Sequence, residues 1–133
     1  FKHFMPVTMH RFEAPADLFH MTRIAATLVE DCGPCALVAA EGAVRDGVDS
    51  ELVNAALKAD PPEGDLKTAF IFGAAIARQS IEAFTIGDAI EEAYGRTVRL
   101  ELAMTAATVR AYPAMKRGLG LSKACSLTPL RVG

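Results

Sequence analysis

The chain has 133 residues, of which 51% are hydrophobic and 23% charged, and its formal net charge is −2. This length suffices for one domain with its own hydrophobic core. The interspersed, weakly acidic charge argues against the basic stripe that nucleic acids and anionic membrane surfaces favour. Uncharged apolar runs, such as 69–77, are far shorter than the ~20 residues of a membrane helix. We therefore expect a globular protein with neither a nucleic-acid nor a membrane partner.

The three cysteines are too few, and an odd number, for the disulfide framework of a small secreted protein. Two of them, Cys32 and Cys35, enclose Gly-Pro in a Cys-x-x-Cys motif. A close pair of this kind fits a working dithiol in a reducing compartment, so we expect a cytoplasmic location. We expect Cys125, the third, to be a structural or idle thiol.

Residues 1–14 mix aromatic residues, Met and His without a clear period, and we expect an irregular N-terminal arm there. From residue 15 onward, apolar residues recur at steps of three and four, the spacing of one helix face. This spacing, together with Pro, Gly and Asp at the ends, predicts helices over 15–32, 34–46, 51–59, 65–81 and 89–111. Pro113 must kink or end the last of these, and one or two further helical turns follow it.

The predicted fold is all-α, a small antiparallel bundle of five to six helices in a single domain over 15–133. Few runs alternate as a strand would, and Ala-rich stretches such as 69–77 and 100–109 let helices pack closely. The fourth and fifth predicted helices are apolar nearly all round. We therefore expect the protein to bury them against copies of itself, as a homo-oligomer.

The sequence Cys-Gly-Pro-Cys is that of the thioredoxin dithiol, but its surroundings differ from those of a thioredoxin. A thioredoxin dithiol follows a buried strand, usually with Trp before the first cysteine. This chain contains no Trp, Asp31 precedes Cys32, and the preceding residues continue a helical pattern. The helical setting argues against a thioredoxin fold.

The stretch 20–57, HMTRIAATLVEDCGPCALVAAEGAVRDGVDSELVNAAL, and the stretch 110–126, RAYPAMKRGLGLSKACS, carry a resemblance. They resemble the alkylhydroperoxidase-like, or carboxymuconolactone decarboxylase-like, family of all-helical proteins, over residues 15–126. In peroxidase members the second cysteine attacks the hydroperoxide, and the first resolves the sulfenic acid as a disulfide. The resemblance therefore implies that Cys35 is peroxidatic and Cys32 resolving. It also implies a hydroperoxide as small-molecule substrate and a dithiol protein as reductant.

This chain departs from the family motif at two positions that relay a proton to and from the reactive thiol. The family has Glu twelve residues before the first cysteine and His four residues after the second. Here these positions hold His20 and Ala39. At ~1.5 Å per residue, His20 lies about 18 Å along its helix from Cys32. We expect the relay to be broken or rebuilt, with His20 as candidate catalytic residue and Glu30, Glu41 or a neighbouring subunit as further sources.

The residues alone leave the identity of the nucleophile open. Helix N-terminal N–H groups favour a thiolate at Cys32, whereas the family precedent names Cys35. The negative charges of Glu30 and Asp31 disfavour a thiolate. The polar residues Tyr112, Lys116 and Arg117 have two possible interpretations: a cluster that faces a substrate, or a solvated helix end.

Metal binding and a non-enzymatic role are the other interpretations of the pair. Cys32, Cys35 and His20 supply three ligands where zinc needs about four, and we expect no metal and no cofactor. His20 could instead be a packed core residue. The leading hypothesis is a thiol-dependent redox enzyme, a peroxidase or disulfide oxidoreductase. The alternative is a degenerate helical scaffold or a small-ligand-binding oligomer.

Overall fold

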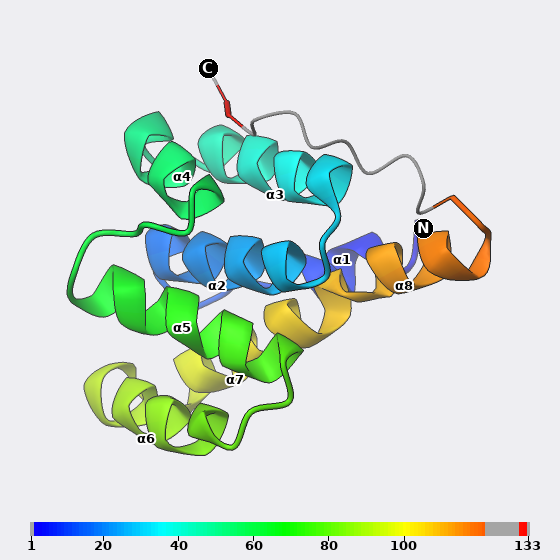
Figure 1. Ribbon diagram of the computed structural model, residues 1–133. Helices are drawn as coiled ribbons and strands as arrows, with labels where there is room; N and C mark the ends of the chain where they lie inside the picture. The colour runs from blue at the N-terminus through cyan, green and yellow to red at the C-terminus, as the bar shows by residue number, and fades with distance from the viewer. Residues whose placement is uncertain (1, 122–130, 133) are drawn as a thin grey trace.

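The computed structural model describes residues 2–121 and 131–132 (Figure 1). All regular secondary structure in these residues is helical, which confirms the all-α prediction. Among them, every helix is too short or too polar to cross a lipid bilayer. The helices are α1 (Met5–Thr8), α2 (Ala16–Val29), α3 (Gly33–Arg45), α4 (Ser50–Leu57), α5 (Asp65–Ala77), α6 (Glu82–Tyr94), α7 (Arg96–Val109) and α8 (Ala111–Gly118).

Helix α2 is the central element, and α3, α4, α5 and α7 all pack against it (Figure 1). Every residue over 18–27 is buried, so the polar side chains of this stretch need partners within the protein. Thr22 Oγ1 donates to the carbonyls of Leu18 and Ala69, and Thr27 Oγ1 donates to that of Arg23. Because of these hydrogen bonds, α2 can be buried among the other helices although it contains several polar residues.

Helices α2 and α5 approach each other closely at Gly73. A Cβ atom at this position would lie 2.1 Å from the backbone carbonyl oxygen of Thr22. Because only glycine lacks that atom, Gly73 permits the two backbones to touch. The Ala-rich face of α5 serves the close packing that its composition predicted.

The single helix predicted over 89–111 is wrong, since two helices, α6 and α7, occupy this part of the chain. Gly95 separates them with φ 95° and ψ 167°. Glycine adopts this conformation readily, whereas a residue with a side chain does not, and the conformation ends α6. The preceding helix, predicted to reach residue 81, ends at Ala77, and α6 already begins at Glu82. The apolar spacing continues across Gly95, so periodicity alone does not reveal the break. The bundle therefore contains more helices than the five to six predicted.

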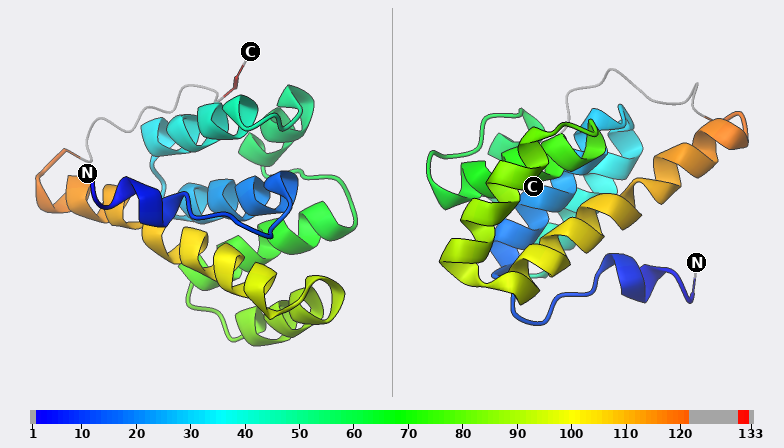
Figure 2. Two further views of the ribbon diagram at one scale, coloured as in Figure 1. Left: turned by 180° about the vertical axis from the view of Figure 1, so that it is seen from behind. Right: turned by 90° about the horizontal axis from the view of Figure 1, so that it is seen from below.

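Helices α7 and α8 follow each other in nearly one line (Figure 2). Arg110, between them, keeps helical angles of φ −69° and ψ −16°. Pro113 is the third residue of α8, where a backbone N–H would lack a partner within the helix. Pro113 thus lies in the first turn of a new helix, and α8 brings Lys116 to Cys32, the N-cap residue of α3.

The N-terminal segment, predicted to be irregular over 1–14, contains the helical turn α1, which packs on α7. The carboxylate of Glu101 on α7 is 1% exposed and accepts hydrogen bonds from three consecutive backbone amides. The donors are the N–H groups of Phe12 at 2.6 Å, Glu13 at 3.1 Å and Ala14 at 2.7 Å. This carboxylate fixes the path of the chain into α2.

Candidate functional site

Cys32 and Cys35 form a disulfide at the junction of α2 and α3, with their Cα atoms 5.3 Å apart. Cys32 is the N-cap residue of α3, and Pro34 occupies the first turn, where its restricted φ suits a helix start. Asp31 adopts φ 53° and turns the chain between the two helices. The local sequence thus places both sulfur atoms at the beginning of α3.

The two sulfur-bearing residues differ in their access to solvent. Cys32 is only 3% exposed, whereas Cys35 is partly exposed. Cys35 also lines a cavity of about 350 Å³, and Cys32 does not. A molecule that reaches the disulfide through this cavity therefore meets Cys35 first.

The cavity lies between α1, α3, α7 and α8, beside the buried face of α2. Its apolar walls include Met5, Val38 and Val109. Arg23 and Lys116 add two cationic side chains to the lining. The volume falls in the range of about 300–1,000 Å³ that is typical of small-ligand pockets.

The N-terminal segment supplies one wall of this cavity through α1. Tyr112 on α8 donates a hydrogen bond to the sulfur of Met5, and its ring packs edge to face against Phe4 at 5.8 Å. The carbonyl of Thr8 accepts hydrogen bonds from Arg23 Nη1 at 2.7 Å and from Thr105 Oγ1. Residues far apart in sequence therefore close the cavity together.

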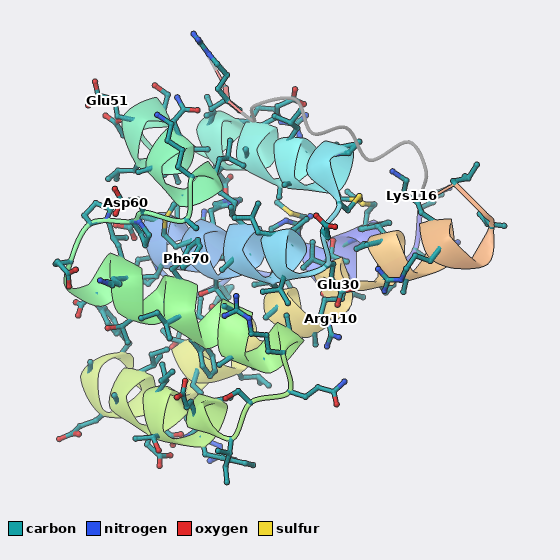
Figure 3. All side chains as sticks on the ribbon, in the orientation of Figure 1. Glu30, Glu51, Asp60, Phe70, Arg110 and Lys116 are labelled. Atoms are coloured by element: carbon teal, nitrogen blue, oxygen red, sulfur yellow. A yellow bond between two sulfur atoms is a disulfide. The ribbon has the colours of Figure 1, made fainter. Side chains whose placement is uncertain are left out.

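Lys116 brings a positive charge to the dithiol. Its ammonium nitrogen lies 3.7 Å from Cys32 Sγ and donates to it. Figure 3 shows Lys116 on α8 next to the start of α3. When the disulfide is reduced, this ammonium and the N-terminal N–H groups of α3 both favour a thiolate at Cys32. Of the three polar residues predicted at the end of the last helix, Tyr112, Lys116 and Arg117, Lys116 therefore contacts the dithiol, whereas Tyr112 bonds to Met5 and Arg117 to Glu30.

Glu30 is held in ion pairs with two arginines, so its negative charge is neutralised. Its two carboxylate oxygens bind Arg110 Nε and Arg117 Nη2, and Figure 3 shows the first pair. Burial alone would raise the pKa of Glu30, but the hydrogen bonds from Arg110 and Arg117 outweigh it and lower that pKa below its ordinary value. Glu30 thus ties the end of α2 to α7 and α8, and its repulsion of a thiolate is offset.

His20 lies at the other end of α3 from the disulfide. It is fully buried, and its Nε2 is 2.9 Å from Oδ2 of Asp46, the C-cap residue of α3. Eleven residues separate Asp46 from Cys35, about 16 Å along the helix axis. Burial lowers the pKa of His20, although the hydrogen bond to Asp46 raises it. The structure therefore brings the two predicted cysteines together and places His20 apart from them.

The remaining candidates are also distant from the sulfur atoms, or outside the described residues. Ala39 is buried in α3, and Glu41 is exposed about 9 Å along that helix from Cys35. Cys125 lies outside the described residues. Arg23 was not predicted, although an arginine in the middle of a helix without other charged residues over 18–29 is a usable signal.

Within the described part of the chain, no group of three or more His, Cys, Asp or Glu side chains is arranged to hold a metal ion. The site combines two cysteines that can form a disulfide, a nearby ammonium group and an apolar cavity. Comparisons of the chain with protein-family models, with curated proteins and with solved structures find no match.

Proposed function

We propose that the protein is a thiol-dependent redox enzyme that cycles Cys32 and Cys35 between dithiol and disulfide. The observation that carries this proposal is the asymmetry of the pair. One sulfur-bearing residue, Cys35, lines an apolar cavity, while the other, Cys32, is buried against the ammonium of Lys116. A dithiol enzyme needs one accessible nucleophile and one partner that reacts only within the protein.

The proposed substrate is a hydroperoxide, with Cys35 as the nucleophile. The Cys35 thiolate attacks the terminal peroxide oxygen, the O–O bond breaks, and the departing alkoxide takes a proton to become an alcohol. Cys35 is then a sulfenic acid. The Cys32 sulfur attacks the Cys35 sulfur, the S–S bond forms, and hydroxide leaves as water with the second thiol proton. Two electrons pass from the dithiol to the peroxide.

A dithiol reductant protein completes the proposed cycle. Its thiolate attacks the accessible sulfur of Cys35, and Cys32 departs as a thiolate beside Lys116. Because a stabilised leaving thiolate speeds exchange, the position of Lys116 favours this direction of attack. The partner's second thiol then releases Cys35 and becomes oxidised.

The alkylhydroperoxidase-like family remains our proposal for the origin of this chain. The all-helical architecture and a dithiol between consecutive helices support it. In this proposal, the positions of the family's proton relay hold a buried His20 bound to Asp46 and a buried Ala39. Lys116 takes over the electrostatic support of the thiols.

The test uses reduced protein and a stoichiometric amount of cumene hydroperoxide, with Cys125→Ser as a background that removes the third thiol. We expect one hydroperoxide consumed for each Cys32–Cys35 disulfide formed, as measured by mass spectrometry and thiol titration. Cys32→Ser should consume one equivalent and hold a sulfenic acid that dimedone traps. Cys35→Ser should consume none.

Two results would overturn the proposal. The first is a reduced protein that keeps both thiols in excess hydroperoxide, and the second is undiminished consumption by Cys35→Ser. If the parent does not turn over hydroperoxide, and the double variant Cys32→Ser, Cys35→Ser is as stable as the parent, the alternative of a helical scaffold is favoured instead.

A further inference from the structure

Arg23 is a buried cation without a carboxylate partner among the described residues. It is 3% exposed, and its Nη1 donates to the carbonyl of Thr8 at 2.7 Å and to Thr105 Oγ1 at 3.5 Å. Both acceptors are neutral, and none of the ion pairs formed by the described residues includes Arg23. Burial lowers the pKa of Arg23, and the phenol of Tyr112 only partly opposes this effect. Because burying a charge without a carboxylate beside it is costly, an anion in the cavity would offset the cost.

Arg23 lines the same cavity as Cys35, and the lining contains no acidic side chain. The two charged groups of the lining, Arg23 and Lys116, are both cationic, while the walls formed by Met5, Val38 and Val109 are apolar. The matching ligand has an apolar body and one anionic head. A cationic ligand or a neutral ligand would leave the buried guanidinium of Arg23 without an opposite charge.

We propose that this cavity binds an amphipathic carboxylate of the fatty-acid type, with its carboxylate on Arg23 and its chain against Met5, Val38 and Val109. Lys116 is already engaged by Cys32, whereas the planar guanidinium of Arg23 can bind a carboxylate through two parallel hydrogen bonds. The inference rests on the proposed function where it names the substrate, a hydroperoxide carried on the chain of such an acid. The binding site itself does not require turnover.

The direct test compares three probes of equal chain length by calorimetry on the oxidised protein. Decanoate carries the carboxylate, 1-decanol carries no charge, and decylammonium carries the opposite charge. We expect decanoate to bind about tenfold or more tightly than 1-decanol, and decylammonium to bind most weakly. Equal affinity for decanoate and 1-decanol, or no decanoate binding, would overturn the inference.

Variants locate the carboxylate. Arg23→Gln keeps a polar side chain but loses the charge, and we expect its decanoate affinity to fall to that for 1-decanol. Because Arg23 is buried, a second variant guards against a general loss of folding. Val38→Glu places a negative charge in the cavity wall at a side chain that is 55% exposed. It should weaken decanoate binding about tenfold.

Val44→Glu is the matched control, since Val44 is exposed on the same helix and does not line the cavity. It should bind decanoate as the parent does. An equal loss in Val44→Glu and Val38→Glu would show a non-specific charge effect and would overturn the inference. The double variant Cys32→Ser, Cys35→Ser should still bind decanoate, because the site does not depend on the thiols. If the parent binds decanoate but consumes no hydroperoxide, the proposed function is refuted and the ligand site stands.

Discussion

The ammonium of Lys116 lies 3.7 Å from the sulfur of Cys32, although 84 residues separate the two along the chain. The contact forms because α8 continues α7 in nearly one line (Figure 2). This direction brings Lys116 to the N-cap residue of α3. A positive charge at this distance stabilises a thiolate that forms there. The relationship gives the dithiol an electrostatic partner outside its own motif.

Lys116→Met removes this charge and keeps most of the apolar side chain. We expect the variant to favour the disulfide over the dithiol by about tenfold relative to the parent, because the reduced form loses its stabilised thiolate. The equilibrium is measured against a dithiothreitol redox buffer at neutral pH. Lys58→Met, which removes an exposed charge after α4, should leave it unchanged. An unaltered equilibrium in Lys116→Met would contradict the role of Lys116.

The pair of His20 and Asp46 predicts how stability depends on pH. Burial lowers the pKa of His20 below 6.5, so the folded protein keeps this ring neutral while the unfolded chain protonates it. The free energy of unfolding should therefore be highest above pH 6.5 and decline as the pH falls from 6.5 toward the lowered value. The pKa of Asp46 is also lowered, first by its hydrogen bond with His20, and its contribution is lost only below about 3.8.

Urea unfolding at pH values on both sides of 6.5 measures this decline, which should flatten in His20→Gln. Asp46→Ala leaves the buried Nε2 without its partner and should cost about 1–3 kcal/mol. Glu41→Ala, at an exposed position of the same helix, should change stability by less than about 0.5 kcal/mol. A decline of the same slope in His20→Gln would assign the pH dependence to other groups.

The contact between Gly73 and the backbone of Thr22 predicts that a single methyl group forces α2 and α5 apart. A Cβ at residue 73 would lie 2.1 Å from a carbonyl oxygen that cannot rotate away. We expect Gly73→Ala to lower the free energy of unfolding by about 1–3 kcal/mol, as overpacking does. Gly42→Ala is the matched control in α3, because beyond the neighbouring backbone of its own helix no atom lies within 4 Å of the added Cβ.

That control should stabilise the protein by up to about 1 kcal/mol, since alanine loses less backbone entropy than glycine in a helix. Thermal or urea unfolding compares both variants with the parent. If Gly73→Ala stabilises the protein as Gly42→Ala does, the backbones of α2 and α5 do not touch at this position.

The carboxylate of Glu101 predicts the stability of the N-terminal segment. Glu101→Gln keeps the shape but replaces one acceptor oxygen by an NH₂ group, which opposes the amides of Phe12, Glu13 and Ala14. We expect a loss of about 1.5–3 kcal/mol and faster hydrogen exchange at these amides. The exposed Glu92→Gln on α6 is the control and should leave both measurements unchanged. Unchanged exchange in Glu101→Gln would remove this carboxylate from the organisation of the segment.

Assembly with further copies of the chain stays a prediction, and exposed apolar side chains support it. Ile81 and Phe84, at the start of α6, are 79% and 69% exposed. Their burial between copies would remove this apolar surface from water. We expect light scattering to give a homo-oligomer, and Ile81→Ser with Phe84→Ser to give a smaller species. Phe12→Ser, which removes another exposed ring, is the control, and a monomeric parent would refute the prediction.

The local features of this protein could be predicted from the order of its residues. Helices follow from apolar spacing over a few turns, and Gly33-Pro34 between two cysteines suffices to bring the sulfur atoms to one helix start. The break at Gly95 could not be predicted, because the helical spacing is the same on both sides of it and a glycine inside a helix is tolerated. His20 was grouped with the cysteines by its position in a motif, whereas α3 places its partner Asp46 at the opposite end.

The sequence by itself determined the helical class and the coupling of two thiols, because both depend on residues within a few positions of one another. Only the tertiary structure decided what surrounds those thiols. Lys116 beside Cys32 and the buried Arg23 in the cavity wall depend on contacts between segments about 80 to 100 residues apart. Such contacts arise when helices pack, since packing sets which side chains meet and which charges remain without a partner.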